Sequence, residues 1–271
     1  CVRYPPAPGG AETVVKAYSE GLRDLGHDVE VVTTDLYTET PFVKKKMPSV
    51  VNGINVTRHK AYTVSGEAHY VLAPGMVQSF LSKNADIIHT HSYGYFQNHA
   101  GWIRERFQST PWVITPHFHP SWSMWGGSKR KTLREFYDTV IGKGTLEAAD
   151  LITCVSKHER DMLVSEIGLK EDNIKIIYNG INWADWSSVP NKEVFRKQYP
   201  TVSEKFVLFA GRLATNKGLS DLISAMQLID KKSVDLVITG ADMGLGEQLE
   251  KEASDKGVTM HRLGHIDDET Y

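Results

Sequence analysis

The chain has 271 residues, with 31 Lys and Arg against 33 Asp and Glu, so its formal net charge is -2. Hydrophobic residues make up 41% and charged residues 24%, a composition that excludes disordered, collagen-like and coiled-coil proteins. The near-neutral charge argues against a nucleic-acid binder, which would be basic overall. No run approaches the roughly 18 apolar residues of a membrane-spanning helix. Two cysteines, Cys1 and Cys154, are too few for a disulfide framework and favour a cytoplasmic protein.

The two ends of the sequence predict a fragment of a longer protein. There is no initiator methionine, and Cys1-Val2 reads as the end of a strand. Residues 267–271 read as the start of a helix, so we expect further sequence at both ends.

Residues 1–182 predict alternating strands and helices. A helix is predicted over residues 12–25, where Val14, Val15, Tyr18 and Leu22 have helical spacing. Asn52-Gly53 between two apolar runs predicts a hairpin, and the capping-box pattern at residues 156–159 predicts the start of a helix. Further strands are predicted at residues 29–33, 86–90, 112–115, 151–155 and 174–177, and further helices at residues 70–83, 94–107 and 129–148.

The same alternation restarts after an irregular stretch that ends at Pro190. Strands are predicted at residues 206–210, 235–239 and 258–263, and helices at residues 218–229 and 247–255. Strands that alternate with helices of this length form parallel sheets covered on both faces. The sequence therefore predicts an α/β protein of two similar domains, residues 1–182 and 183–271, with a cleft between them.

Ligands of parallel sheets bind beyond the carboxyl ends of the strands. Gly9-Gly10 stands in the first loop of this kind, where adjacent glycines either let the backbone approach an anion or simply form a turn. The loop matches neither the P-loop nor the dinucleotide-binding fingerprint, so both of those protein classes are disfavoured.

Two His-x-His pairs follow the next predicted strands: His89 with His91, and His117 with His119. Alternate residues of a strand point the same way, so these side chains are candidate metal ligands, polar residues of a cleft, or histidines bonded to nearby carbonyls. A catalytic metal would also need a carboxylate ligand, and Asp86 is the only carboxylate close to these histidines in the sequence.

The most specific loop runs from residue 210 to residue 218. It follows an apolar strand and carries Arg212, with Lys217 five positions later at the start of a predicted helix. Two cations beside the positive end of a helix are suited to a pyrophosphate, and they would stabilise the charge that develops when a nucleoside diphosphate leaves.

Six motifs together resemble those of the family 4 glycosyltransferases, in the order that the family has them. The resemblance covers nearly the whole chain. It implies the GT-B fold, with two Rossmann-like domains around a donor cleft. The motifs are Gly9-Gly10-Ala11-Glu12, Asp86-Ile87-Ile88-His89-Thr90-His91, Thr115-Pro116-His117, Val155-Ser156, Asn179-Gly180-Ile181, and Gly211-Arg212-Leu213 with Lys217-Gly218.

The resemblance also implies roles for single residues. Arg212 and Lys217 match the pair that grips the donor diphosphate, and His117 matches the histidine beside the donor sugar. Gly9 and Gly10 match the loop that closes over the diphosphate. Three further residues are expected to contact the nucleotide: Gly240, His265 and Ile266.

The function implied is that of a retaining hexosyltransferase that uses a UDP-, GDP- or ADP-sugar. The acceptor would be a hydroxyl of a sugar, a lipid or a small metabolite, and neither a metal nor another cofactor is expected. Two alternatives stay open. One is a metal-dependent hydrolase built on the two His-x-His pairs, and the other is a non-catalytic protein that binds nucleotide sugars.

The sequence departs from the family pattern in two places. Asn182 stands where the family usually has Asp, and the E-x7-E region would lie beyond Tyr271. We therefore expect an incomplete C-terminal domain, because one of those glutamates usually orients the donor sugar.

Residues 129–143 are a candidate for peripheral membrane contact at the inner face of the membrane. Lys129-Arg130-Lys131, Arg134 and Lys143 share a predicted helix with apolar residues, and Trp122 and Trp125 precede it. Glu135 and Asp138 interrupt the basic pattern, which favours an ordinary solvated helix face.

Overall fold

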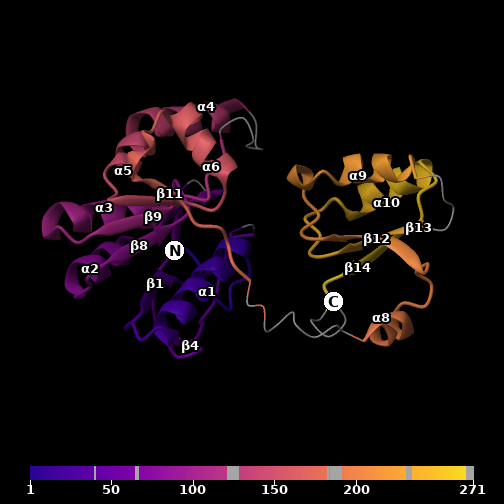
Figure 1. Ribbon diagram of the computed structural model, residues 1–271, viewed down its shortest axis with the longest axis horizontal. Coiled ribbons are helices and arrows are strands. Elements are labelled where there is room, and N and C mark those ends of the chain that lie inside the picture. Colours follow the sequence, from indigo (N-terminus) through magenta and orange to yellow (C-terminus); the bar gives the residue numbers. More distant parts are fainter. Residues whose placement is uncertain are drawn as a thin grey trace. The chain divides into compact units, whose positions relative to one another are not determined.

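The computed structural model describes residues 1–39, 41–64, 67–120, 128–181, 183, 191–229 and 234–266. The chain divides into two compact units, unit 1 (Cys1–Gly180) and unit 2 (Ile181–Tyr271). Each unit is an α/β structure with a parallel sheet, as the alternation of apolar runs predicts (Figure 1).

The first sheet of unit 1 has the strand order β1 (Glu30–Thr34), β5 (Ile54–His59) and β4 (Val50–Val51). β1 and β5 are parallel, and β4 pairs with β5 through the predicted hairpin, whose Asn52 and Gly53 have φ values of 48° and 79°. Residues 1–2 run alongside β1, where Thr34 N–H donates to the Val2 carbonyl at 3.2 Å. Helix α1 (Gly10–Asp24) follows and packs Val15 against this sheet.

Four short strands form two antiparallel pairs that the sequence pattern did not predict. They are β2 (Leu36–Thr38) with β3 (Val43–Lys44), and β6 (Tyr62–Val64) with β7 (Glu67–Leu72). The predicted helix over residues 70–83 is therefore wrong at its start, and α2 is Pro74–Ser82. Val71 pairs with Thr63 instead of entering a helix, and Pro74 suits a first helical turn because it has no N–H to leave unsatisfied.

The second sheet of unit 1 is parallel, with the order β11-β10-β9-β8. Its strands are β8 (Ile88–His91), β9 (Trp112–Thr115), β10 (Leu151–Cys154) and β11 (Ile174–Ile176). Trp112 is fully buried at its centre, and its indole N–H donates to Thr90 Oγ1 at 2.9 Å. The helical segments between and after these strands are α3 (Phe96–Gln108), α4 (Ser128–Tyr137), the π-turn η2 (Asp138–Gly142), α5 (Lys143–Glu147), α6 (Lys157–Met162), the π-turn η3 (Leu163–Ile167) and the 3-10 turn η4 (Glu171–Asn173).

Unit 2 has a three-stranded parallel sheet with the order β12 (Lys205–Ala210), β13 (Val234–Thr239) and β14 (Met260–Gly264). Helices α9 (Leu219–Met226) and α10 (Gly246–Asp255) cover one face of it (Figure 1). β13 is buried along most of its length, as a central strand must be, and packs against Ile223 and Leu249. A short helix that was not predicted, α8 (Lys192–Gln198), precedes the sheet, and the 3-10 turn η5 (Thr215–Lys217) precedes α9.

Candidate functional site

Three histidines gather at the carboxyl end of the second sheet of unit 1. His89 and His91 come from β8 and stack with ring centroids 4.2 Å apart. His117 follows β9, and its Nε2 lies 3.5 Å from His91 Nδ1. Tyr18 of α1 covers His89 and His91, with its ring centroid 5.9 Å from each. The structure thus brings three of the four predicted strand-end histidines together.

Hydroxyl groups anchor this cluster to the sheet. His89 Nε2 lies 2.7 Å from Thr115 Oγ1, which lies 2.6 Å from Thr153 Oγ1. These contacts connect β8, β9 and β10, because the three side chains stand near the ends of parallel neighbours. The positions of His89 and His91 are therefore set by a regular strand, which is more rigid than a loop.

The histidines favour the neutral state. His91 is only 3% exposed, and burial, with the neighbouring His89 and His117, holds its pKa well below the usual value. Burial also lowers the pKa of His117, and His119 lowers it further. A neutral imidazole has one donor and one acceptor nitrogen, so His117 can accept a hydrogen bond or donate one to a sugar hydroxyl at pH 7.

A buried carboxylate holds the turn that carries His117. His117 has a left-handed backbone, with φ 47°, and the next peptide N–H, that of Phe118, donates to Glu159 Oε1 at 2.7 Å. Val155 N–H donates to the other oxygen of Glu159 at 2.7 Å. Burial raises the pKa of Glu159, and the backbone N–H groups of residues 118, 155 and 117 oppose that rise.

The predicted capping box is only half formed. Ser156 Oγ accepts from the Glu159 N–H at 3.1 Å, as expected for the residue before a helix. In a complete box the Glu159 carboxylate would return to the N–H of Ser156, but here it accepts from Val155 and Phe118. Glu159 is thus a residue of the site region that we did not predict. The capping pattern at residues 156–159 was its only signal in the sequence. That pattern could not show that the carboxylate also binds Phe118 in the loop after β9.

The Gly9-Gly10 loop stands at the start of α1. Gly9 precedes the helix with φ 156°, and Gly10 is its first residue. A Cβ at Gly9 would collide with the Glu12 carboxylate, which is paired with Arg3 at 2.8 Å. Burial raises the pKa of Glu12, and Arg3 opposes the rise. A side chain at Gly9 would therefore have to displace the end of the Glu12 side chain, whereas Gly10 has open space around its Cα.

Glycines bring the ends of the three strands of unit 2 close together. Gly211 N–H donates to the Thr239 carbonyl, and Gly240 N–H donates to the Gly264 carbonyl at 2.7 Å. Gly240 has φ 129°, and a Cβ there would collide with the Gly211 carbonyl group. Arg212, Gly240 and His265 consequently follow three adjacent strands at one edge of the sheet.

Arg212 and Lys217 are exposed cations on the β12–α9 connection. Neither side chain makes a hydrogen bond or an ion pair within the part of the chain that the structure describes. Arg196 and Arg262 of the same unit contrast with them, because Arg196 binds three carbonyls and Arg262 binds two carboxylates. Lys217 ends the turn η5, one residue before Gly218 at the start of α9.

Two predicted nucleotide contacts follow β14. His265 is exposed and Ile266 is half-buried, directly behind Gly264, which has a left-handed φ of 72°. Gly9, Gly10 and His117 belong to unit 1, and the other predicted site residues, Arg212, Lys217, Gly240, His265 and Ile266, belong to unit 2.

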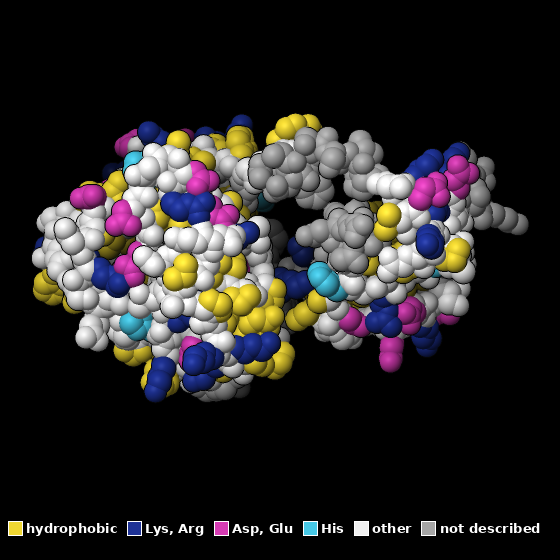
Figure 2. All heavy atoms as spheres, turned by 90° about the horizontal axis from the view of Figure 1, so that it is seen from below, with side chains coloured by type: hydrophobic (Ala, Val, Ile, Leu, Met, Phe, Trp, Pro, Cys, Tyr) yellow, Lys and Arg dark blue, Asp and Glu magenta, His cyan; other side chains and the backbone are white. Residues whose placement is uncertain are grey.

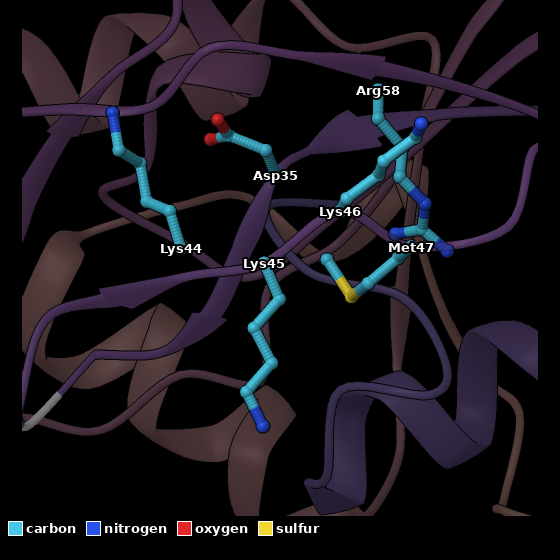
Figure 3. A pocket seen from close by; sticks show the side chains of 6 residues that line it. All are labelled: Asp35, Lys44, Lys45, Lys46, Met47 and Arg58. Carbon is cyan, nitrogen blue, oxygen red and sulfur yellow. The ribbon is translucent and has the colours of Figure 1, made fainter.

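A separate hollow of about 410 Å³ lies in unit 1. Figure 3 shows the side chains of Lys44, Lys45 and Lys46 pointing in different directions there. Lys44 Nζ donates to the Ala61 carbonyl at 3.3 Å, and Lys45 Nζ lies 3.5 Å from the Tyr37 ring centroid. Because Lys44 and Lys45 have partners and the three lysines do not converge, we assign no ligand to the hollow. Its lining residues are Asp35, Lys44, Lys45, Lys46, Met47 and Arg58.

The candidate membrane segment has an inward and an outward side. Arg134 is on the inward side, where it pairs with Asp138 at 2.7 Å and donates to the His119 carbonyl at 3.0 Å. The outward side carries four exposed apolar residues: Leu133, Phe136, Val140 and Ile141. Arg134 is therefore part of the packed side and not of a membrane-facing basic surface. Trp122, Trp125 and the side chains of Lys129 and Arg130 lie outside the described residues.

Three further features of the described residues concern membrane spans, metal ligands and surface charge. Among the described residues, no helix has the length and apolar content to span a bilayer, and no three His, Cys, Asp or Glu side chains are grouped to hold a metal ion. On the face seen in Figure 2, Lys and Arg stand among Asp and Glu over most of the described surface. That mixture differs from the single basic stripe of a phosphate-tracking nucleic-acid binder.

Solved structures with this architecture are glycosyltransferases of the GT-B type. A glycosyltransferase from Rickettsia africae matches with a TM-score of 0.65 and 15% identity, over 98% of this chain and 68% of that one. Anabaena HepE, solved with UDP and glucose, matches with a TM-score of 0.66 and 18% identity, over 98% and 69%. The fold is therefore α/β of the GT-B type, as the resemblance implied.

The chain belongs to Glycosyltransferase Family 4, whose sequence model matches residues 8–184, and residues 191–270 match Glycosyl transferases group 1. An uncharacterized glycosyltransferase of Methanocaldococcus jannaschii is 28% identical over 88% of this chain and 61% of its own length. The phosphatidylinositol N-acetylglucosaminyltransferase GPI3 subunit of Saccharomyces cerevisiae is 25% identical over 83% and 47%. The chain thus spans about half to two thirds of the length of these relatives.

Proposed function

We propose that the protein transfers a hexose from a nucleoside-diphosphate sugar to an acceptor hydroxyl, with retention of anomeric configuration. Arg212 and Lys217 are the observation that carries this proposal. They are two exposed cations without partners among the described residues, on the loop that the family resemblance assigns to the donor diphosphate. In this proposal residues 183–271 belong to the donor domain, and residues 1–182 form the acceptor-side domain.

The two cations fit the needs of the leaving group. The bond between the anomeric carbon and the β-phosphate oxygen breaks, so negative charge accumulates on the diphosphate. A guanidinium and an ammonium stabilise that charge more strongly as it develops, which lowers the barrier as well as binding the donor. They supply the neutralisation that a divalent ion gives other transferases, and we therefore propose a metal-independent reaction.

The glycines leave the strand ends of unit 2 open to close approach of the donor. Gly240 and Gly211 pack their backbones together at the strand ends, and no side chain of theirs stands before the sheet edge. We assign His265 and Ile266 to contacts with the base, and Gly9 and Gly10 to the diphosphate. His117 is assigned to the donor sugar, where its neutral imidazole bonds a hydroxyl without adding charge.

The acceptor oxygen attacks the anomeric carbon on the face that the diphosphate leaves. Its proton passes to an oxygen of the departing phosphate, so the new glycosidic bond replaces the phosphate ester with retention. This route needs no protein base, and we assign none. The acceptor is a hydroxyl of a sugar, a lipid or a small metabolite, and a lipid acceptor would place the protein at the inner face of the membrane.

A ligand screen on the full-length protein tests the donor assignment. UDP is tried first, because HepE was solved with it, and GDP and ADP follow. The cognate diphosphate should raise the melting temperature by binding the native state. No shift with any of the three would contradict the donor site.

Turnover then separates the enzyme from its alternatives. Transfer from the cognate donor to a panel of hydroxyl acceptors is followed by diphosphate release, and the anomeric configuration of the product is read by NMR. Transfer activity that survives a chelator supports the proposal. A protein that contains stoichiometric zinc or iron, and whose activity the chelator abolishes, would instead be a metal-dependent hydrolase. Donor binding without transfer to any acceptor would indicate a non-catalytic binding protein.

A further inference from the structure

The turn after β9 has a feature that regular packing does not explain. His117 is not a glycine, yet its φ of 47° lies in the left-handed region, which only a few per cent of non-glycine residues adopt, although histidine is enriched among them. Such residues persist only where surrounding contacts impose the conformation, and they concentrate at functional sites. The contact that meets this turn is the Glu159 carboxylate, through the Phe118 N–H at 2.7 Å.

Glu159 is an unusual carboxylate. Its residue is only 4% exposed, and no Lys, Arg or His pairs with it among the residues that the structure describes. A buried carboxylate without a cation is costly unless several donors satisfy it. Here the donors are peptide N–H groups at the ends of two neighbouring strands, Phe118 after β9 and Val155 after β10.

Helix capping does not account for this arrangement. Ser156 already accepts from the Glu159 N–H, which is enough to cap α6. One oxygen of the carboxylate instead accepts from Phe118 N–H, 41 positions earlier in the chain. It therefore fixes the β9 turn relative to β10, and with it the direction in which the His117 imidazole leaves the sheet, toward His91.

We propose that Glu159 is a positioning residue for His117, whose carboxylate holds the left-handed turn that presents the imidazole to the reacting sugar. This inference rests on the role proposed for His117. It assigns Glu159 no contact with substrate. Its effect on the reaction passes through His117 alone, and this property makes the inference testable.

The test uses Glu159→Gln in the full-length protein. The amide keeps the shape of the side chain but directs an NH2 group at one of the two peptide N–H donors, which breaks that hydrogen bond. Glu166→Gln is the matched control, because Glu166 lies exposed on η3 just behind α6. Should Glu159→Gln fail to fold, Glu159→Asp replaces it, since it keeps the charge and withdraws the carboxylate.

A double-mutant cycle gives the first readout. Glu159→Gln should lower kcat about tenfold, with nucleotide affinity changed less than about twofold, because misplacement of a reacting group affects rate more than binding. In a His117→Ala background the same substitution should change kcat less than about twofold. An equal loss in both backgrounds would overturn the inference.

The second readout does not depend on activity. The ring Cε1–H signal of His117, assigned by its loss in His117→Ala, should move in Glu159→Gln and stay in place in Glu166→Gln. An unchanged signal in Glu159→Gln would overturn the inference. If His117→Ala keeps full activity, the function proposed for His117 is wrong, and the ring signal still decides whether Glu159 positions it.

Discussion

The carboxyl ends of the sheets in unit 1 and unit 2 carry polar side chains in opposite states. In unit 1 the polar groups satisfy one another. His91 meets His117, His89 meets Thr115, and Glu159 meets backbone N–H groups. In unit 2 Arg212 and Lys217 have no partner among the described residues, although other arginines of that unit are fully engaged.

In the function that we propose, this difference fits two kinds of site. The polar groups of unit 1 already have partners, which suits side chains that orient a neutral sugar. The exposed cations of unit 2 would bind a charged donor, which enters and leaves in each cycle. The predictions below, in order of decreasing effect, test each side of this contrast.

The largest effect should come from Gly240→Ala, which tests how tightly the edge of unit 2 is built. The new methyl group would collide with the Gly211 carbonyl at a backbone φ of 129°. We expect a loss of about 3 kcal/mol or more in the free energy of unfolding. Chemical denaturation followed by circular dichroism measures it.

Gly244→Ala is the matched control for that measurement. Gly244 also has a positive φ, 92°, but open space surrounds the place of a Cβ. Only backbone strain is added, so the loss should be about 1 kcal/mol. Equal losses at the two glycines would mean that the Gly211–Gly240 contact does not shape this edge.

Arg212→Ala and Lys217→Ala test whether the free cations of unit 2 bind an anion. Each should weaken nucleoside-diphosphate binding by about 1.5–3 kcal/mol, because a charge-assisted contact is lost. Titration calorimetry with UDP and GDP measures the change. Lys251→Ala, an exposed lysine on α10, should leave affinity unchanged. Wild-type affinity in both loop variants would refute the assignment of the cations.

Most of the fold could be predicted from the sequence, because long alternating apolar runs encode it. β9 was predicted at its observed bounds, and the predicted strands that correspond to β1, β8, β10, β11, β12, β13 and β14 lie within two residues of theirs. Residues 1–2, which we read as the end of a strand, belong to no strand in the structure. The errors lie where the pattern is short. β2, β3 and α8 have few residues, and residues 70–72 pair with β6 through contacts that local periodicity cannot express.

Only those residues of the candidate site could be predicted that are polar and stand at the end of a predicted strand. Histidines were expected at the ends of β8 and β9, and the structure brings His89, His91 and His117 together. Glu159 was not, because its partner Phe118 is distant in sequence and belongs to another strand. The backbone of His117 could not be predicted either, since the enrichment of histidine in the left-handed region is too weak a signal for a single position.

His117→Ala tests whether the assembled cluster of unit 1 acts on the reaction. We expect kcat to fall about tenfold and nucleotide affinity to change less than about twofold, because the imidazole faces sugar and not diphosphate in our proposal. Steady-state kinetics and calorimetry measure the two quantities. His158→Ala, an exposed histidine on α6, is the control. An equal loss of rate and affinity would make the role of His117 structural.

The smallest effect should appear in the pH dependence of unit 1. His91 stays neutral in the native protein because burial and the neighbouring His89 and His117 hold its pKa well below 6.5. The unfolded chain takes up a proton on this imidazole as the pH falls below about 6.5, so the native state binds fewer protons. Stability contributed by the neutral ring is therefore present above that pH and lost below it, by about 1 kcal/mol between pH 6.5 and 5.5.

His91→Phe removes this titration and keeps a ring to stack on His89. Denaturant unfolding followed by tryptophan fluorescence compares the two proteins. It reports mainly on unit 1, because four of the six tryptophans belong to that unit. The wild type should lose more stability than the variant over this interval, since His89 and His117 titrate in both. If the free energies of unfolding of the two proteins fall in parallel with pH, His91 takes up its proton in the native protein as it does in the unfolded chain. The contrast between a neutral edge in unit 1 and a cationic edge in unit 2 would then fail.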